Sequence, residues 1–101
     1  MEAQLTYEVF AQNVKTKFHI PIADTEGLEL ELTEVSEPKR TPGQEQFSLF
    51  FRGPLETFLG QGIRPFEHTQ MGQFDLFIVP IAKGDEGYAY EAVFNRFTEG
   101  G

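Results

Sequence analysis

The two histidines are the residues whose side chains could transfer protons or bind a metal ion near neutral pH. With His19 and His68 alone, a three-histidine metal site is impossible, and neither residue lies in an HExxH motif. His68 follows Glu67 and shares a strand face with Phe66, which is typical of a hydrogen-bonded, partly buried structural histidine. An enzyme that uses His68 with Glu67 or Asp75 is the alternative to this structural role, and it is the third hypothesis for the function.

Other motifs for catalysis or cofactor binding are missing from the sequence. It contains no Cys, which excludes disulfides, thiolate nucleophiles, zinc fingers and iron–sulfur clusters, and it has no nucleophile elbow or phosphate-binding glycine loop. The acidic turns at residues 24–27 and 85–87 offer a few oxygens, but calcium needs about six to eight. We expect no catalytic residue, no bound metal and no cofactor.

Period-two alternation of apolar and polar residues predicts the elements that would position these side chains. Within residues 28–36, three leucines alternate with charged or polar residues, but Val35 falls out of phase. A bulge near Thr33 and Glu34 would return Val35 to the core. Six strands are predicted, at residues 15–23, 28–36, 46–52, 63–69, 73–82 and 87–97.

The connections between these strands are short, which favours antiparallel neighbours. Pro42 and Gly43 fit the centre of a type II turn. Residues 5–14 have helical spacing, and a helical turn within residues 53–62 would fold over one barrel end. The sequence therefore predicts an all-β fold, a small antiparallel barrel-like sandwich of about six strands with a short N-terminal helix.

Length and charge limit the protein further. A chain of 101 residues has room for one hydrophobic core, so we expect a single β domain over residues 1–101. A net charge of −8 would repel a phosphate backbone, so we expect no nucleic-acid partner. No apolar run of 18 residues and no signal-peptide pattern is present, so we expect no membrane insertion and residence in the cytoplasm unless a dedicated machine exports the protein.

Two strands carry apolar residues on both faces. Phe50 points away from the apolar face of its strand, and Phe77 and Val79 do the same in theirs. The N-terminal helix or the loop at residues 53–62 could cover this second face. The other explanation is a protein–protein interface formed by Phe50, Phe77 and Val79, because an uncovered aromatic patch is a liability for a monomer.

Several motifs in a fixed order resemble those of a known family. They are LELELTEVSE at 28–37, FSLFFRGP at 47–54, QGIRPFEHTQMG at 61–72, FDLFIVP at 74–80 and YEAVFN at 90–95. In these motifs the chain resembles a family of small bacterial all-β proteins catalogued as a domain of unknown function. The resemblance implies no catalytic residues, and it implies an association with phage-tail collar-like proteins. The chain departs from the family pattern at Arg64 and Pro65, and Pro65, which has no N–H, predicts an edge-like strand.

Three functions follow as hypotheses. The first is a non-enzymatic structural or protein-interaction module that binds a protein partner or self-associates, and that belongs to a phage-tail-like or surface assembly. The second is a small-ligand-binding β-barrel with its pocket in the interior or beneath the loop at residues 53–62. Eleven phenylalanines are expected to fill so small an interior, which argues against the ligand binder. The third is the histidine-dependent enzyme.

Overall fold

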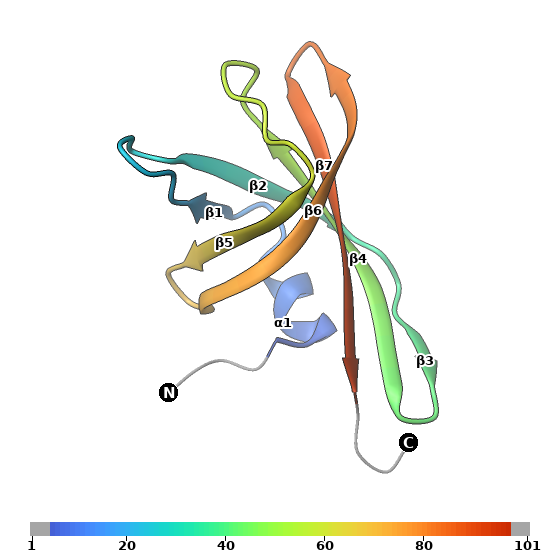
Figure 1. Cartoon of the computed structure of the whole chain (residues 1–101). Coiled ribbons are helices and arrows are strands. Elements are labelled where there is room, and N and C mark those ends of the chain that lie inside the picture. Colours follow the sequence, from blue (N-terminus) through green and yellow to red (C-terminus); the bar gives the residue numbers. More distant parts are fainter. Residues whose placement is uncertain (1–4, 98–101) are drawn as a thin grey trace.

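The computed structural model describes residues 5–97, and in this part of the chain one antiparallel sheet of seven strands has the order β2-β1-β5-β6-β7-β4-β3. An additional pairing of β2 with β4 closes six of these strands into a barrel and leaves β3 outside it (Figure 1). The predicted all-β barrel with a short N-terminal helix is confirmed. The elements are α1 (Tyr7–Gln12), β1 (Lys17–Ile20), β2 (Leu28–Val35), β3 (Lys39–Thr41), β4 (Gln44–Gly53), β5 (Gly62–His68), β6 (Gly72–Gly84) and β7 (Gly87–Phe97).

The predicted bulge in β2 is confirmed, and it lies where the barrel closes. Leu32 pairs with Phe51 and Glu34 with Phe50, so Thr33 is an extra residue in β2. The three leucines before the bulge are buried, and Val35 packs against the core after it. The bulge therefore keeps the apolar side chains of β2 on the inner face while the strand bends onto β4.

Strand β3 was not predicted. It is three polar, exposed residues long, so it carries no alternation that could be recognised. The turn at Pro42 and Gly43, which was predicted, joins β3 to β4, and Gly43 takes the positive φ of +82° that a type II turn requires. This turn brings Thr41 opposite Gln44 and lets β3 extend the sheet beyond the barrel.

Pro65 weakens one side of β5. Residues 62–68 of β5 pair throughout with β6, whereas within the described residues one pair, His19 with Glu67, joins β5 to β1. The sequence predicted that β5 would be an edge-like strand. This prediction is wrong, because β1 lies beside β5 in the sheet. The missing N–H of Pro65 instead coincides with the least-paired seam of the barrel.

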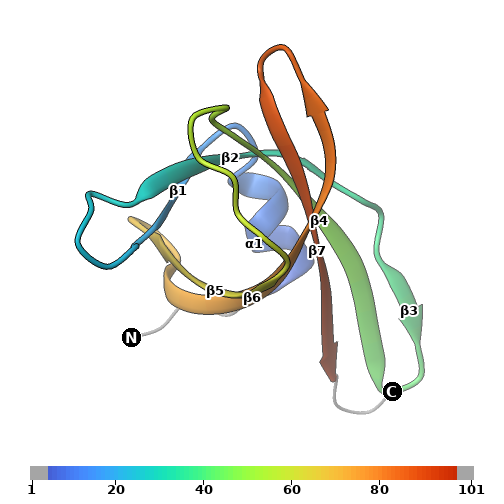
Figure 2. The same ribbon diagram turned by 45° about the horizontal axis from the view of Figure 1, so that its top comes forward.

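The helix α1 fills one end of the barrel. The Thr6 Oγ1 accepts a hydrogen bond from the Val9 N–H at 3.2 Å, which caps the helix. Phe10 is fully buried, and its ring lies 5.6–5.9 Å from the rings of Phe47, Phe74 and Phe94. Figure 2 shows the helix enclosed by the curved sheet. Among residues 5–97, no helix combines the length and apolar character needed to cross a bilayer.

The loop at residues 53–62 covers the other end of the barrel. It contains a turn at residues 55–56 in place of the expected helical turn, and its predicted place over a barrel end is right. Its Leu59 is buried and donates its backbone N–H to the hydroxyl of Tyr90 at 3.0 Å. Burial raises the pKa of Tyr90 above its ordinary value, so the hydroxyl that accepts this hydrogen bond is neutral. This tertiary hydrogen bond occupies an N–H that a helical turn would have used locally.

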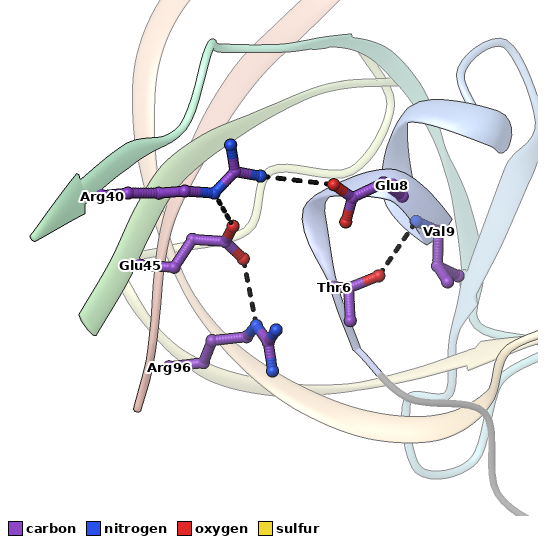
Figure 3. Close-up of polar contacts among 6 residues, drawn as sticks. All are labelled: Thr6, Glu8, Val9, Arg40, Glu45 and Arg96. Carbon is purple, nitrogen blue, oxygen red and sulfur yellow. Dashed lines mark hydrogen bonds and ion pairs between the residues drawn. The ribbon is translucent and has the colours of Figure 1, made fainter. Parts of the chain in front are cut away.

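A buried carboxylate joins β3 to the barrel strands β4 and β7. Glu45 on β4 accepts hydrogen bonds from the Nε of Arg40 at 2.7 Å and the Nε of Arg96 at 3.0 Å (Figure 3). Arg40 also contacts Glu8 of α1 at 3.2 Å. Burial raises the pKa of Glu45, but the hydrogen bonds and charges of the two arginines outweigh it, so its pKa is lowered from the ordinary 4.5. The carboxylate thus ties β3, β4, β7 and, through Arg40, the helix.

The packing of α1 predicts the effect of removing its buried ring. Phe10→Ala should lower the free energy of unfolding by about 3–5 kcal/mol, because the neighbouring rings cannot fill the cavity. Phe97→Ala, in a residue that is 88% exposed at the end of β7, is the matched control and should cost about 0.5 kcal/mol or less. Urea unfolding of both variants measures the difference. Equal losses would mean that the helix is not docked in the barrel.

The Arg40–Glu45–Arg96 cluster predicts a pH-dependent effect. Glu45→Gln should destabilise the fold by about 1–3 kcal/mol at pH 7, because the charge-assisted hydrogen bonds are lost. A lowered pKa in the folded state gives stability that is present above pH 4.5 and lost as the pH falls through the folded value. As the pH is lowered from 7 to about 3, the free energy of unfolding of Glu45→Gln should therefore converge with that of the wild type. Glu26→Gln, in an exposed turn, is the control, and a parallel offset at every pH would contradict this account.

Candidate protein interface

The three residues proposed as an interface lie on the outer face of the barrel. Phe77 is 47% exposed, and Phe50 and Val79 are half-buried. Their strand neighbours Leu49 and Ile78 are buried inside, which confirms the two-sided apolar character of β4 and β6. The faces were therefore assigned correctly from alternation alone.

The explanation that the helix or the loop covers this outer face is wrong. The ring of Phe10 contacts inward-pointing phenylalanines, so α1 lies inside the curve of the sheet. The loop at residues 53–62 is held at a barrel end by Tyr90. Both segments close the ends of the barrel because the core there would otherwise be open to water. The outer side chains of β6 remain exposed.

Two further residues extend the apolar surface. Ile63 of β5 pairs directly with Phe77 and is 69% exposed, and Val93 of β7 is 48% exposed on the same face. We call Phe50, Ile63, Phe77, Val79 and Val93 the outer apolar band. It crosses β5, β6, β7 and β4 in the order in which these strands are paired. Ile63 and Val93 were not predicted as part of this surface, because each is an ordinary strand residue until the pairing register places it on the same face as Phe77.

Carboxylates accompany the band on the same face. Asp75 of β6 pairs with Pro65, two positions from Phe77, and Glu91 of β7 lies between Val79 and Phe50 in the register. Glu67 lies further along β5, and the Nε2 of Gln73 donates a hydrogen bond to it at 3.4 Å. Within residues 5–97, none of Glu67, Asp75 and Glu91 forms an ion pair, so their charges face solvent uncompensated.

His68 has a structural role in the core. Its Nδ1 accepts hydrogen bonds from the N–H groups of Gln70 at 3.1 Å and Met71 at 3.2 Å, so the proton must be on Nε2. The Nε2 then donates to Thr16 Oγ1 at 2.9 Å, and that hydroxyl donates to the carbonyl of Asn13 at 2.6 Å. Burial lowers the pKa of His68, which favours the neutral ring. The predicted hydrogen-bonded, buried histidine is confirmed.

The remaining candidate residues are not brought together. His68 points inward, whereas Glu67 and Asp75 lie on the outer face, so the three do not converge on a cleft. His19 lies 3.7 Å from Glu29 in a half-exposed pair. In the part of the chain that the structure describes, no three His, Asp or Glu side chains lie close enough together to hold a metal ion.

The hydrogen bonds of His68 predict how stability depends on pH. Because the pKa in the folded state is below 6.5, the unfolded chain binds a proton first, and stability should fall as the pH drops below 6.5 towards the folded value. In His68→Asn, the side-chain oxygen can still accept the two backbone N–H bonds, but it has no proton to take up. Between about pH 8 and pH 5, the free energy of unfolding should therefore fall more steeply with decreasing pH for the wild type than for the variant. His19 is present in both, and identical pH profiles would contradict the structural assignment.

A family model matches most of the chain. No curated protein and no solved structure is significantly similar to the chain. The family model described as Domain of unknown function (DUF6916) matches residues 5–94, which include the whole barrel except the last three residues of β7. Because this match covers most of the 101 residues, the chain belongs to the family Domain of unknown function (DUF6916).

Proposed function

We propose that the protein is a non-enzymatic module that binds another protein through the outer apolar band. The observation that carries this proposal is the exposure of Ile63, Phe77 and Val93 on adjacent strands of one face. Contiguous apolar surface rimmed by polar groups is typical of protein-interaction sites. Aromatic and aliphatic side chains at the centre of such a patch supply most of the binding free energy when they are desolvated.

Outward positions of β2 and of part of β4 support this choice by contrast. Outward positions of β2 carry Glu29 and Glu31, and those of β4 beside the band carry Gln46 and Ser48. A strand can therefore keep its place in this barrel with polar outward residues. Apolar residues at the band are not needed for closure of the sheet, which favours a role in binding.

The setting that we propose is a tail-like or surface assembly. This part of the proposal comes from the resemblance of the sequence motifs to a family associated with phage-tail collar-like proteins. A small barrel with filled ends and one apolar outer face suits a piece that joins other subunits. Such a role needs no catalytic group.

The ligand-binding alternative is less well supported by the packing. The rings of Phe18, Phe51 and Phe66 occupy the barrel interior with centroids 5.2–6.3 Å apart. All three are fully buried, as are the neighbouring aliphatic residues of the core. An interior pocket is thus taken up by the protein's own side chains. At the loop of residues 53–62, the other location considered, Gly53, Pro54 and Thr57 line a solvent-open hollow of about 620 Å³. The packing therefore argues against a ligand in the interior alone.

Site-specific photocrosslinking tests the proposed function. A benzophenone amino acid in place of Phe77, introduced into the chain in its source cells, should give discrete adducts with a defined protein, because the side chain would be buried at an interface. The same probe in place of Glu26, in an exposed turn, should give none. Adding Ile63→Ser to the Phe77 probe should weaken the adduct, while changing the free energy of unfolding by about 1 kcal/mol or less.

Two results would overturn the proposal. One is the absence of discrete adducts from the Phe77 probe, and the other is an adduct pattern shared with the Glu26 probe. An adduct between two copies of the chain would preserve the interaction module and identify the partner as a second copy.

A further inference from the structure

We infer that the partner presents a cationic segment, with Lys or Arg side chains interspersed among apolar ones, to the outer apolar band. This inference rests on the proposed function and adds the chemistry of the partner. It follows from the three carboxylates that lie on the same face as the band.

The carboxylates lie among the apolar residues of the band and at its margin. Glu91 pairs with Val79 on one side and with Phe50 on the other. Asp75 lies two positions before Phe77 on β6, so both side chains point the same way. A partner that covers the apolar side chains must therefore also cover or closely approach Asp75 and Glu91.

In the part of the chain that the structure describes, no Lys or Arg pairs with these carboxylates. The outward positions of β5, β6 and β7 beside the band, all within the described residues, hold no Lys or Arg. The nearest cation on this face of β4 is Arg52, which contacts Glu31 at 3.0 Å and Glu86 at 3.5 Å. Arg52 is therefore already paired with carboxylates outside the band.

Docking changes the energetics of these groups. In the free protein, water solvates Asp75 and Glu91 at little cost. Under a partner, that water is removed, and an unpaired buried charge is strongly unfavourable. A cationic side chain on the partner would offset the loss, and it would also accelerate encounter with a chain of net charge −8.

The same charges disfavour the other occupants. Two copies meeting through this face would bring two sets of Glu67, Asp75 and Glu91 together without cations between them. An anionic membrane or a nucleic acid would meet the same repulsion. A protein segment that carries both positive charge and apolar side chains satisfies both parts of the surface.

The experiment uses the full chain and three synthetic peptides of equal length, with binding measured by fluorescence anisotropy. One peptide alternates Lys with Leu, the second alternates Glu with Leu, and the third alternates Lys with Ser. The Lys/Leu peptide should bind about tenfold or more tightly than either of the others, and its affinity should fall as salt rises from about 0.05 to 0.3 M.

Matched variants separate the band from the overall charge of the protein. Asp75→Asn with Glu91→Gln should weaken binding of the Lys/Leu peptide by about two- to tenfold, in keeping with partly exposed ion pairs. Asp24→Asn with Glu26→Gln removes the same net charge from a distant exposed turn and should leave the affinity nearly unchanged. Phe77→Ser should weaken binding of the Lys/Leu peptide as well.

Each contrary result has a distinct meaning. If the two double variants weakened binding of the Lys/Leu peptide equally, the peptide would be attracted by the overall acidity of the protein, and the inference would be overturned. Failure of the Lys/Leu peptide to bind would also overturn it. Equal binding of the Lys/Leu and Glu/Leu peptides, both lost in Phe77→Ser, would overturn the cationic partner but leave the interaction module standing. Loss of the module itself would be seen in the crosslinking from position 77.

Discussion

The pairing of β2 with β4 is the interaction on which the rest of this structure depends. Without it, the strands would form an open, curved sheet whose apolar inner face could not be enclosed. The bulge at Thr33 allows β2 to bend onto β4 while Val35 stays on the core side. Once the sheet is closed, α1 and the loop at residues 53–62 need cover only the two ends, and the outer face is left uncovered.

Much of this fold could be predicted because alternation records which side of a strand is buried. It gave the strands of the barrel, the bulge near Thr33 and the opposed faces of Phe50 and Phe77. It could not reveal β3, whose three polar residues have no buried side. It also could not say which surface α1 would cover, since an apolar helix fits either face of a sheet until the curvature of the sheet is known.

The candidate site was predictable in part for the same reason. Phe50, Phe77 and Val79 stood out because they violate the pattern of their own strands. Ile63 and Val93 do not break the alternation of apolar and polar residues in their own strands. They join the band through the cross-strand register, which cannot be read from a single sequence. The accompanying carboxylates were visible as residues, but their place beside the band also depends on register.

The seam between β1 and β5 gives the barrel an uneven mechanical character. Each of the other five junctions is a ladder of four or more residue pairs, two of them interrupted by a bulge, whereas this junction is joined by a single pair in the described chain, between His19 and Glu67. Local opening at this point breaks the fewest backbone hydrogen bonds. The barrel is therefore best regarded as a rolled sheet whose weakest junction lies between β1 and β5. Local unfolding should start at this junction, on the strand that carries Ile63.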